Sequence, residues 1–384
     1  MPFIYRSVIQ RSDPTPKARE LLAVFPSMVN DCLRAGLEKK MSDFPRIKEL
    51  CWPRMREYRV HDSYRVSAMF DAANLIKKFQ TDSKRTRAGL PRVSNEYFSA
   101  SLGVYLEAKE LLLPGNIRTP LNGHTLAVLR AKGVEVVSAT MTQETCSVIY
   151  RKFVQGVAPR GMVAVDLNLD NVTTFDTEGE SIVYDTSALS QIHEAYRRVK
   201  SHFRRNDARM KGTVWRKYAR LEHDRKLAVL HSVSSEIVKR AAAKKQAIVM
   251  EDLRWLRDMY RRRSGYSAYY LSKMNAWPFR QILHQLAYKA EWLGLPVVTI
   301  DPDWTSEKCC ECDGLMEVPP VEGIVVCSVC GNAIDRHLNG AKNILRRGLR
   351  SGPGWSAGEA VTGSNLPGWE TRARVDADNP ASQR

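Results

Sequence analysis

Four cysteines near the end of the chain have the spacing of a metal site. They form two pairs, each with two residues between its members, and fourteen residues separate the pairs: Cys309, Cys312, Cys327 and Cys330. Each pair can direct two sulfur atoms at one ion, and four thiolates complete a tetrahedral Zn²⁺ site with no open position. We therefore expect a structural zinc ribbon at residues 305–334. Cys310 could replace Cys309 as a ligand, although only Cys309 has the two-residue spacing.

Two carboxylates stand in apolar surroundings. Asp166 lies within the segment MVAVDLNL, and Glu251 follows AIVM. Burying an unpaired charge is costly, and two neighbouring carboxylates repel each other unless a cation lies between them. A pair of Mg²⁺ ions can use such an arrangement to activate water and to stabilise the leaving oxygen of a phosphodiester. We expect both strands to be adjacent in one sheet, with Asp166 and Glu251 as magnesium ligands.

The elements that position these residues follow a recognisable order after Gly161. Three short strand patterns come first, and a long helical region covers about 187–245. A buried strand around 246–253, an amphipathic helix over 278–293, a further strand and a helix over 339–347 follow. This order predicts an α/β, RNase H-like domain over 161–348, with the zinc ribbon inserted before the last helix.

The first 160 residues have a different pattern. An opening strand is followed by helical periodicity over 18–37 and 63–79, and strand-like pieces, among them 125–131, fill the region from 95 to 154. We expect residues 1–160 to form a mainly helical recognition lobe with a small β unit. Residues 349–384 are rich in Gly, Ser and Pro, and we expect a disordered tail there.

Charge points to a polyanionic partner. The chain has 59 Lys and Arg against 42 Asp and Glu, a formal net charge of +17. Such an excess attracts nucleic acid. No apolar run approaches the length of a membrane span, and the first residues do not have the pattern of a signal peptide. The expected location is the cytoplasm, associated with the nucleoid in a prokaryote.

Basic residues cluster at two places with aromatic residues between them. One cluster lies in the helical region before residue 220 and the other directly follows Glu251. Such clusters are typical of a groove that grips phosphates, although a solvated helix face is the simpler alternative. The candidate nucleic-acid-binding residues are Arg204, Arg205, Arg209, Lys211, Arg254, Arg257, Arg261, Arg262 and Arg263. Trp304, just before the ribbon, is expected to pack rather than to stack on a base.

The second half of the chain also resembles a known family. The strings MEDLRWLRD, DPDWTSEKCCEC and CSVCGNAIDRHLNGAKNIL are similar to the C-terminal half of TnpB, the transposon-encoded RNA-guided nucleases related to type V CRISPR effectors. The resemblance covers about 161–348 and implies a RuvC-like domain. It further implies a guide RNA derived from a transposon end, a double-stranded DNA target beside a short recognised motif, and Mg²⁺-dependent cleavage.

In this resemblance Asp166 and Glu251 match the first two catalytic acids. The third motif departs from the family pattern Asp-Arg-Asp-x-Asn, because His337 stands at the place of the third acid in DRHLN. Imidazole can bind a divalent ion but brings no negative charge. Either His337 or Asp335 completes the site. The alternatives to an active nuclease are a guided DNA-binding protein with impaired cleavage and a guide-independent accessory protein of transposition.

Overall fold

The computed structural model describes the following ranges of the chain: 3–82, 90–203, 210–253, 268–318 and 323–351. Within them the chain forms two compact units, divided between Phe153 and Val154. Each unit has its own sheets and its own buried side chains. None of the helices in these ranges has both the length and the apolar character needed to cross a membrane.

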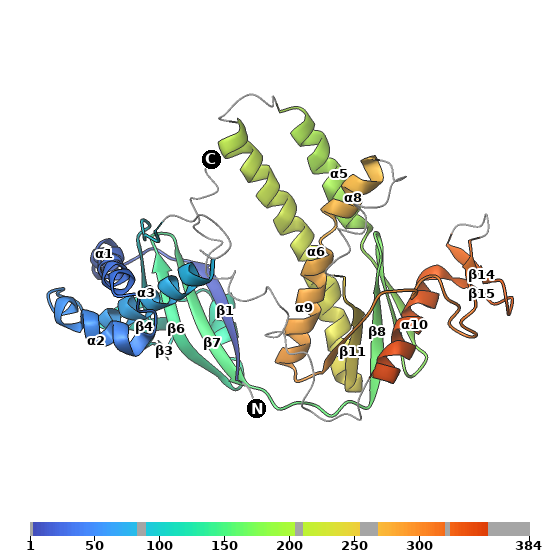
Figure 1. The fold of residues 1–384 in the computed structure, drawn as a ribbon, viewed down its shortest axis with the longest axis horizontal. Coiled ribbons are helices and arrows are strands. Elements are labelled where there is room, and N and C mark those ends of the chain that lie inside the picture. Colours follow the sequence, from blue (N-terminus) through green and yellow to red (C-terminus); the bar gives the residue numbers. More distant parts are fainter. Residues whose placement is uncertain (1–2, 83–89, 204–209, 254–267, 319–322, 352–384) are drawn as a thin grey trace. The chain divides into compact units, whose positions relative to one another are not determined.

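The N-terminal unit combines helices with two antiparallel sheets of order β1-β7-β6-β2 and β3-β4-β5 (Figure 1). Its helices are α1 (Pro16–Glu38), α2 (Phe44–Met55), α3 (Asp62–Asp82) and α4 (Gly123–Leu129). Its strands are β1 (Phe3–Arg11), β2 (Tyr97–Ala100), β3 (Tyr105–Glu107), β4 (Glu110–Leu113), β5 (Ile117–Pro120), β6 (Val134–Thr142) and β7 (Thr145–Phe153). The β part is therefore more than the small unit expected from the sequence.

Local signals explain where α1 begins. The Thr15 hydroxyl accepts a hydrogen bond from the backbone N–H of Ala18 at 3.4 Å, and Pro16 occupies the first turn, where its missing N–H costs nothing. The apolar stripe of the helix is buried, including Leu22 and Phe25 at 0% exposure. The sequence prediction of helices over 18–37 and 63–79 is confirmed by α1 and α3.

The prediction of one strand in the N-terminal half is wrong. Residues 125–131 contain most of α4 and no strand. The side chain of Asn122 accepts the backbone N–H of Thr125 at 2.8 Å, which caps a short helix before the apolar residues begin. Helix α2, whose start is capped by Asp43, was not among the predicted elements. In both places a polar cap residue is the signal that apolar patterning alone misses.

The second unit is built on a five-stranded sheet of order β10-β9-β8-β11-β12. Strands β8, β9 and β10 form antiparallel hairpins, whereas β11 runs parallel to both β8 and β12. The strands are β8 (Gly161–Leu167), β9 (Asn171–Asp176), β10 (Ser181–Asp185), β11 (Gln246–Glu251) and β12 (Val297–Ile300). The strands occur in the sequence order predicted.

Helices cover both faces of this sheet (Figure 1). On one face, α6 and α9 bury the side chains of Val163, Val165, Ile248 and Met250. On the other face, α10 packs on the alternate residues of the same strands, such as Ala164 and Val249. The helices of the unit are α5 (Ser187–Ser201), η1 (Met210–Trp215, a π-helix), α6 (Arg216–Lys244), α8 (Ala268–Ala276), α9 (Phe279–Trp292) and α10 (Arg336–Ser351).

Helix α10 approaches the sheet closely because it carries a glycine at the contact. A Cβ atom on Gly348 would lie 2.7 Å from the methyl groups of Val249, closer than carbon atoms pack. The helix continues to Ser351, four residues past its predicted end at 347. The rest of the predicted tail, 352–384, lies outside the described residues.

The segment between β12 and α10 forms a small three-stranded sheet of order β13-β14-β15. Its strands are β13 (Met316–Glu317), β14 (Ile324–Cys327) and β15 (Ala333–Asp335). This sheet lies in the region predicted as the ribbon, and its last strand leads directly into α10.

Candidate functional site

The two predicted carboxylates lie side by side on one face of the sheet. The parallel register pairs Val249 with Ala164 and Met250 with Val165, so the next positions along both strands are Glu251 and Asp166. Alternate residues of a strand share a face. Asp166 therefore shares the face of Met162 and Ala164, and Glu251 that of Ala247 and Val249, which is the α10 face in both cases. The two strands are adjacent as predicted, and both positions lie on the same face of the sheet.

Asp166 is held in a buried environment. Only 6% of the residue is exposed, and the side-chain amide of Asn168 donates a 2.8 Å hydrogen bond to its Oδ2. Helix α10 passes so close that a Cβ on Gly340 would lie 3.3 Å from that oxygen. Burial raises the pKa of Asp166 to about 6, although the Asn168 hydrogen bond and the charge of Arg336 act in the opposite direction.

Glu251 is positioned by a residue that the sequence analysis did not select. The hydroxyl of Thr305, itself 3% exposed, donates a 2.5 Å hydrogen bond to Glu251 Oε1. Burial, together with the negative charge of Asp166, raises the pKa of Glu251 to about 7, against the Thr305 hydrogen bond and the positive charge of Arg347. The sequence offered one signal for Thr305: it is a polar residue that lies between the acidic DPD segment and the first cysteine.

The start of α10 brings a third group to the carboxylates. His337 Nδ1 lies 3.8 Å from Asp166 Oδ2. Burial, together with the charge of Arg336, lowers the pKa of His337, so the neutral imidazole with a free lone pair is favoured. Asp335 is exposed, and its Oδ1 accepts the backbone N–H groups of His337 and Leu338 at 2.9 and 3.0 Å. Asp335 thus caps α10, and His337 is the residue in contact with Asp166.

This donor set fits a divalent cation. Burial raises the pKa values of both carboxylates and so disfavours their ionised forms, and no Lys or Arg side chain in the described part of the chain forms an ion pair with either of them. A hard cation such as Mg²⁺ prefers carboxylate oxygens, and a neutral imidazole nitrogen can complete the set for a softer metal. The fit rests on the chemistry of Asp166, Glu251 and His337.

The four predicted cysteines converge in the ribbon. Their sulfur atoms all lie within 4.8 Å of one another, with 3.8 Å between Cys309 and Cys330 and 3.4 Å between Cys312 and Cys327. Sulfurs bound tetrahedrally to one zinc ion at 2.3 Å are separated by about 3.8 Å. The sulfur of Cys310 instead lies 3.6 Å from Glu311 Oε1. The cluster is compatible with a single zinc ion held by the cysteines of the two spaced pairs.

Backbone N–H groups prepare the cluster for a cation. The N–H groups of Val329 and Cys330 point at Cys327 Sγ at 3.4 and 3.5 Å. These donors, Cys330 foremost, lower the pKa of Cys327 to about 6 and so favour the thiolate that zinc requires. Similar donors from Cys312 and Glu311 outweigh the effect of burial and lower the pKa of Cys309.

Two asparagines on α10 tie the ribbon to the carboxylate site. Asn339 accepts the N–H of Cys310 at 2.9 Å and donates to the carbonyl of Lys308 at 2.8 Å. Asn343 donates to the carbonyls of Lys308 at 2.7 Å and Thr305 at 2.9 Å. Both side chains are fully buried. The segment that supplies the first zinc ligand and the partner of Glu251 is therefore fixed to the helix that carries His337.

The predicted nucleic-acid-binding residues are almost all outside the described ranges. Residues 204–209 and 254–267 contain every one of them except Lys211, which lies in η1 and whose side chain is not described. Their role stays a prediction. The prediction that Trp304 packs is wrong: the residue is 55% exposed, with a left-handed φ of +64°.

Comparisons with known proteins agree with this organisation. Residues 279–344 match the family described as the Cas12f1-like TNB domain. A TnpB-like protein of Methanocaldococcus jannaschii, MJ0751, is 27% identical over 194 residues, which are 48% of this chain and 68% of that protein. A putative RNA-guided DNA endonuclease of Streptomyces pristinaespiralis is 30% identical over 200 residues, 50% of this chain and 46% of that protein.

A solved structure has a similar fold. The Cas12f1 chain of a cryo-EM structure of a Cas12f1–sgRNA–target DNA complex superposes with a TM-score of 0.56 at 12% identity, covering 85% of this chain and 81% of that one. At this identity the likeness concerns the α/β fold alone. The chain is therefore similar to TnpB-like proteins and to type V CRISPR effectors of the Cas12f1 type.

The cysteine cluster predicts a metal-content experiment. Cys312→Ser removes one of four thiolates, so we expect the purified variant to lose its zinc during dialysis against a chelator that leaves the wild type loaded. Elemental analysis of the dialysed protein measures this. Cys310→Ser is the matched control, because its sulfur lies outside the cluster, and it should retain zinc. Equal zinc retention in both variants would refute the assignment.

The raised pKa values of the carboxylates predict how stability depends on pH. We consider protein without Mg²⁺ but with zinc bound to the ribbon. In the unfolded state Glu251 has its ordinary pKa of 4.5, whereas in the folded state its pKa is about 7. Stability therefore falls as pH rises through this window, by on the order of 3 kcal/mol for this group. Glu251→Gln should flatten the decline and raise stability at pH 8.

Urea unfolding at pH 5.5 and pH 8 measures this difference. Glu307→Gln is the control, because it removes an exposed carboxylate from the same unit. It should leave the wild-type decline unchanged. If Glu251→Gln declines with pH as steeply as the wild type, Glu251 does not resist ionisation in the folded protein.

Proposed function

We propose that this protein is an RNA-guided DNA endonuclease with a RuvC-like nuclease domain, in which Asp166 and Glu251 hold Mg²⁺. The observation that carries the proposal is the placement of these two buried carboxylates next to each other on the α10 face, with His337 against Asp166. The strand order of the second unit, three antiparallel strands followed by two parallel ones, supports the RNase H-like assignment. The names of the relatives support the reaction class.

The residues around the carboxylates hold them in place. Asn168 orients Asp166, and Thr305 orients Glu251. Bound magnesium would supply Lewis acidity to the phosphodiester and lower the pKa of the attacking water. His337 in its neutral form can add a nitrogen donor or accept a proton from water at Nδ1. The zinc ribbon has a structural part in this proposal, because a complete set of four thiolates leaves no position for a substrate.

The proposed partners are a guide RNA from a transposon end and a double-stranded DNA target beside a short motif. The net charge of +17 supports polyanionic partners. In guided recognition, base pairing reads the sequence, and the protein contacts the backbone and the shape of the duplex. The basic residues before 220 and after Glu251 are the proposed backbone contacts.

His337 favours a second candidate function. Replacing a third acid by an imidazole lowers the negative charge that a hard cation needs. A guided DNA-binding protein that occupies its target and cuts it poorly is therefore the alternative. The guide-independent accessory protein has no observation in its favour beyond the basic composition.

Cleavage of plasmid DNA that carries a sequence matching the copurified RNA tests the function. With Mg²⁺, we expect the wild type to cut, and Asp166→Asn and Glu251→Gln to cut at least about 10²–10³-fold more slowly, because each loses a charged group that acts on the reacting phosphate. Glu307→Gln serves as the control and should cut normally. If wild type and variants all fail to cut but bind the matching DNA with RNA, the alternative function is correct.

The proposed role of His337 predicts a gain of activity. His337→Asp places a third carboxylate next to Asp166, so the Mg²⁺-dependent rate should rise at least tenfold. Asp335→Asn is the comparison: asparagine caps helices about as well as aspartate, so α10 should stay intact while the carboxylate that is not the proposed ligand is removed. Rates measured over a magnesium titration distinguish the two. A loss of activity in Asp335→Asn without a rise in His337→Asp would show that Asp335 completes the site.

A further inference from the structure

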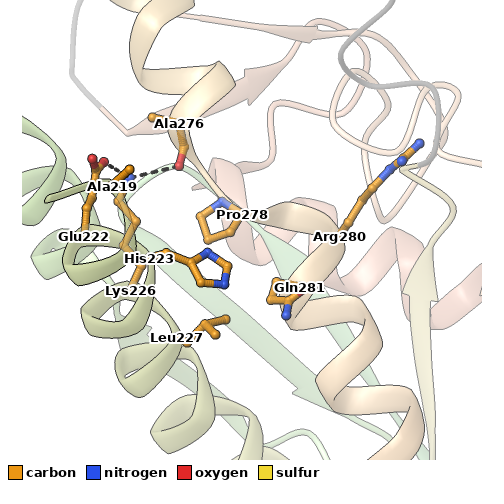
Figure 2. A pocket seen from close by; sticks show the side chains of 9 residues that line it. All are labelled: Ala219, Glu222, His223, Lys226, Leu227, Ala276, Pro278, Arg280 and Gln281. Carbon is orange, nitrogen blue, oxygen red and sulfur yellow. Dashed lines mark hydrogen bonds and ion pairs between the residues drawn. The ribbon is translucent and has the colours of Figure 1, made fainter. Parts of the chain in front are cut away.

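A pocket of about 330 Å³ lies between α6 and the α8–α9 connection, and nothing in the proposed reaction uses it. Figure 2 shows His223 from α6 and Gln281 from α9 facing one another across the space, with Pro278 above and Leu227 below. Arg280 extends from the rim. The pocket thus combines two apolar surfaces with two side chains that donate and accept hydrogen bonds.

This pocket is separate from the carboxylate site. Helices α6 and α9 pack on the sheet face that carries Val163, Val165 and Met250. Asp166 and Glu251 lie on the opposite face, under α10. A ligand in the pocket therefore does not touch the carboxylates, and its binding can be measured independently of cleavage.

A buried charge network holds one wall of the pocket. Glu222 accepts hydrogen bonds from His193 at 3.0 Å, from Lys200 at 2.6 Å and from Lys226 at 2.7 Å. Lys226 also donates to the carbonyl of Ala276 at 3.1 Å, which ties α6 to the end of α8. These partners lower the pKa of Glu222, against the effect of burial. The wall is therefore fixed in place before any ligand arrives, which reduces the ordering cost of binding.

The shape and lining suit a flat heterocycle. A planar ring in this pocket can pack against Leu227 and Pro278, while the His223 and Gln281 side chains can hydrogen-bond with its polar edge. The volume is at the lower end for small-molecule sites, which suits one nucleotide and excludes a duplex. The exposed cations Arg216, Lys217, Arg220 and Arg225 are on the same helix, where they can attract a phosphate backbone.

We propose that this pocket binds one unpaired nucleobase of a nucleic-acid strand, with Leu227 and Pro278 against the ring faces and Gln281 and His223 at its hydrogen-bonding edge. This proposal rests on the proposed function only because both take nucleic acid as the partner. The strand is either RNA or displaced DNA, and the same lining serves both. The phosphates of the strand follow the basic surface of α6.

Two alanines of α6 provide a matched test. Ala219 lines the pocket and Ala228 does not, and both are exposed on the same helix. Ala219→Phe fills the space, whereas Ala228→Phe makes the same change elsewhere. The binding of fluorescent single-stranded oligouridylate and oligothymidylate, measured by anisotropy with the full chain, should weaken about tenfold for Ala219→Phe and stay within twofold of wild type for Ala228→Phe.

An abasic oligonucleotide separates base binding from backbone binding. The abasic oligonucleotide keeps the phosphates, so the wild type and Ala219→Phe should bind it with equal affinity. The wild type should bind it about tenfold more weakly than it binds the oligonucleotide with bases. If Ala219→Phe weakens the binding of oligouridylate more than that of oligothymidylate, the bound strand is RNA. The reverse result identifies DNA. Equal affinity of both Phe variants for the oligonucleotide with bases would overturn the proposal.

The outcome is independent of the nuclease proposal. A base-dependent loss in Ala219→Phe supports the pocket even if Glu251→Gln and the wild type cleave alike, because no carboxylate takes part in this binding. Conversely, cleavage that is lost in Glu251→Gln, together with unchanged oligonucleotide binding by Ala219→Phe, would reject the nucleobase pocket and leave the nuclease proposal standing. Circular dichroism of both Phe variants confirms that α6 is intact, so that a loss of binding reports on the pocket.

Discussion

The second unit depends on the burial of two like charges next to each other. Asp166 and Glu251 occupy neighbouring register positions of parallel strands, and α10 covers both. A sheet that only needed stability would carry apolar residues at these positions, because desolvating one carboxylate already costs several kcal/mol. The neighbouring parts of the unit reduce this cost with hydrogen bonds from Asn168 and Thr305, without removing the charge. That combination is typical of a functional site, and it agrees with the cation proposed for the two carboxylates.

The ribbon contributes to the same site although none of its cysteines lies there. Thr305 is fixed by Asn343, and the following residues up to Cys310 are fixed by Asn339 and Asn343 on α10. A zinc ion bound by Cys309 and its three partners would therefore also restrain the hydroxyl that orients Glu251. Asn339 and Asn343 are suited to these buried positions because their side-chain amides form hydrogen bonds with backbone groups of a segment that has no regular secondary structure of its own.

The sequence predicted those features that depend on spacing and on apolar periodicity. The two Cys-x-x-Cys pairs, the strands that carry Asp166 and Glu251, and the amphipathic helices α1, α3 and α9 all have local signals. The sequence did not predict features that depend on a cap or on a tertiary hydrogen bond. Residues 125–131 are apolar enough for a strand, but Asn122 caps a helix there. Thr305 is an ordinary polar residue until the fold places it at Glu251. Trp304 is aromatic and was expected to pack, yet it is 55% exposed and has a left-handed backbone conformation.

The imidazole at position 337 has an electrostatic consequence for the unit without metal. An aspartate there would place a third negative charge within about 4 Å of Asp166 and would raise the cost of the buried cluster further. His337 is instead held towards its neutral form by burial and by Arg336, and Arg336 also lowers the pKa of Asp166. The chain thus has a smaller charge to bury, and the proposed magnesium site would have a weaker hold on a hard cation. Because both effects come from one side chain, greater stability of the metal-free site and slower magnesium chemistry would be coupled at this position.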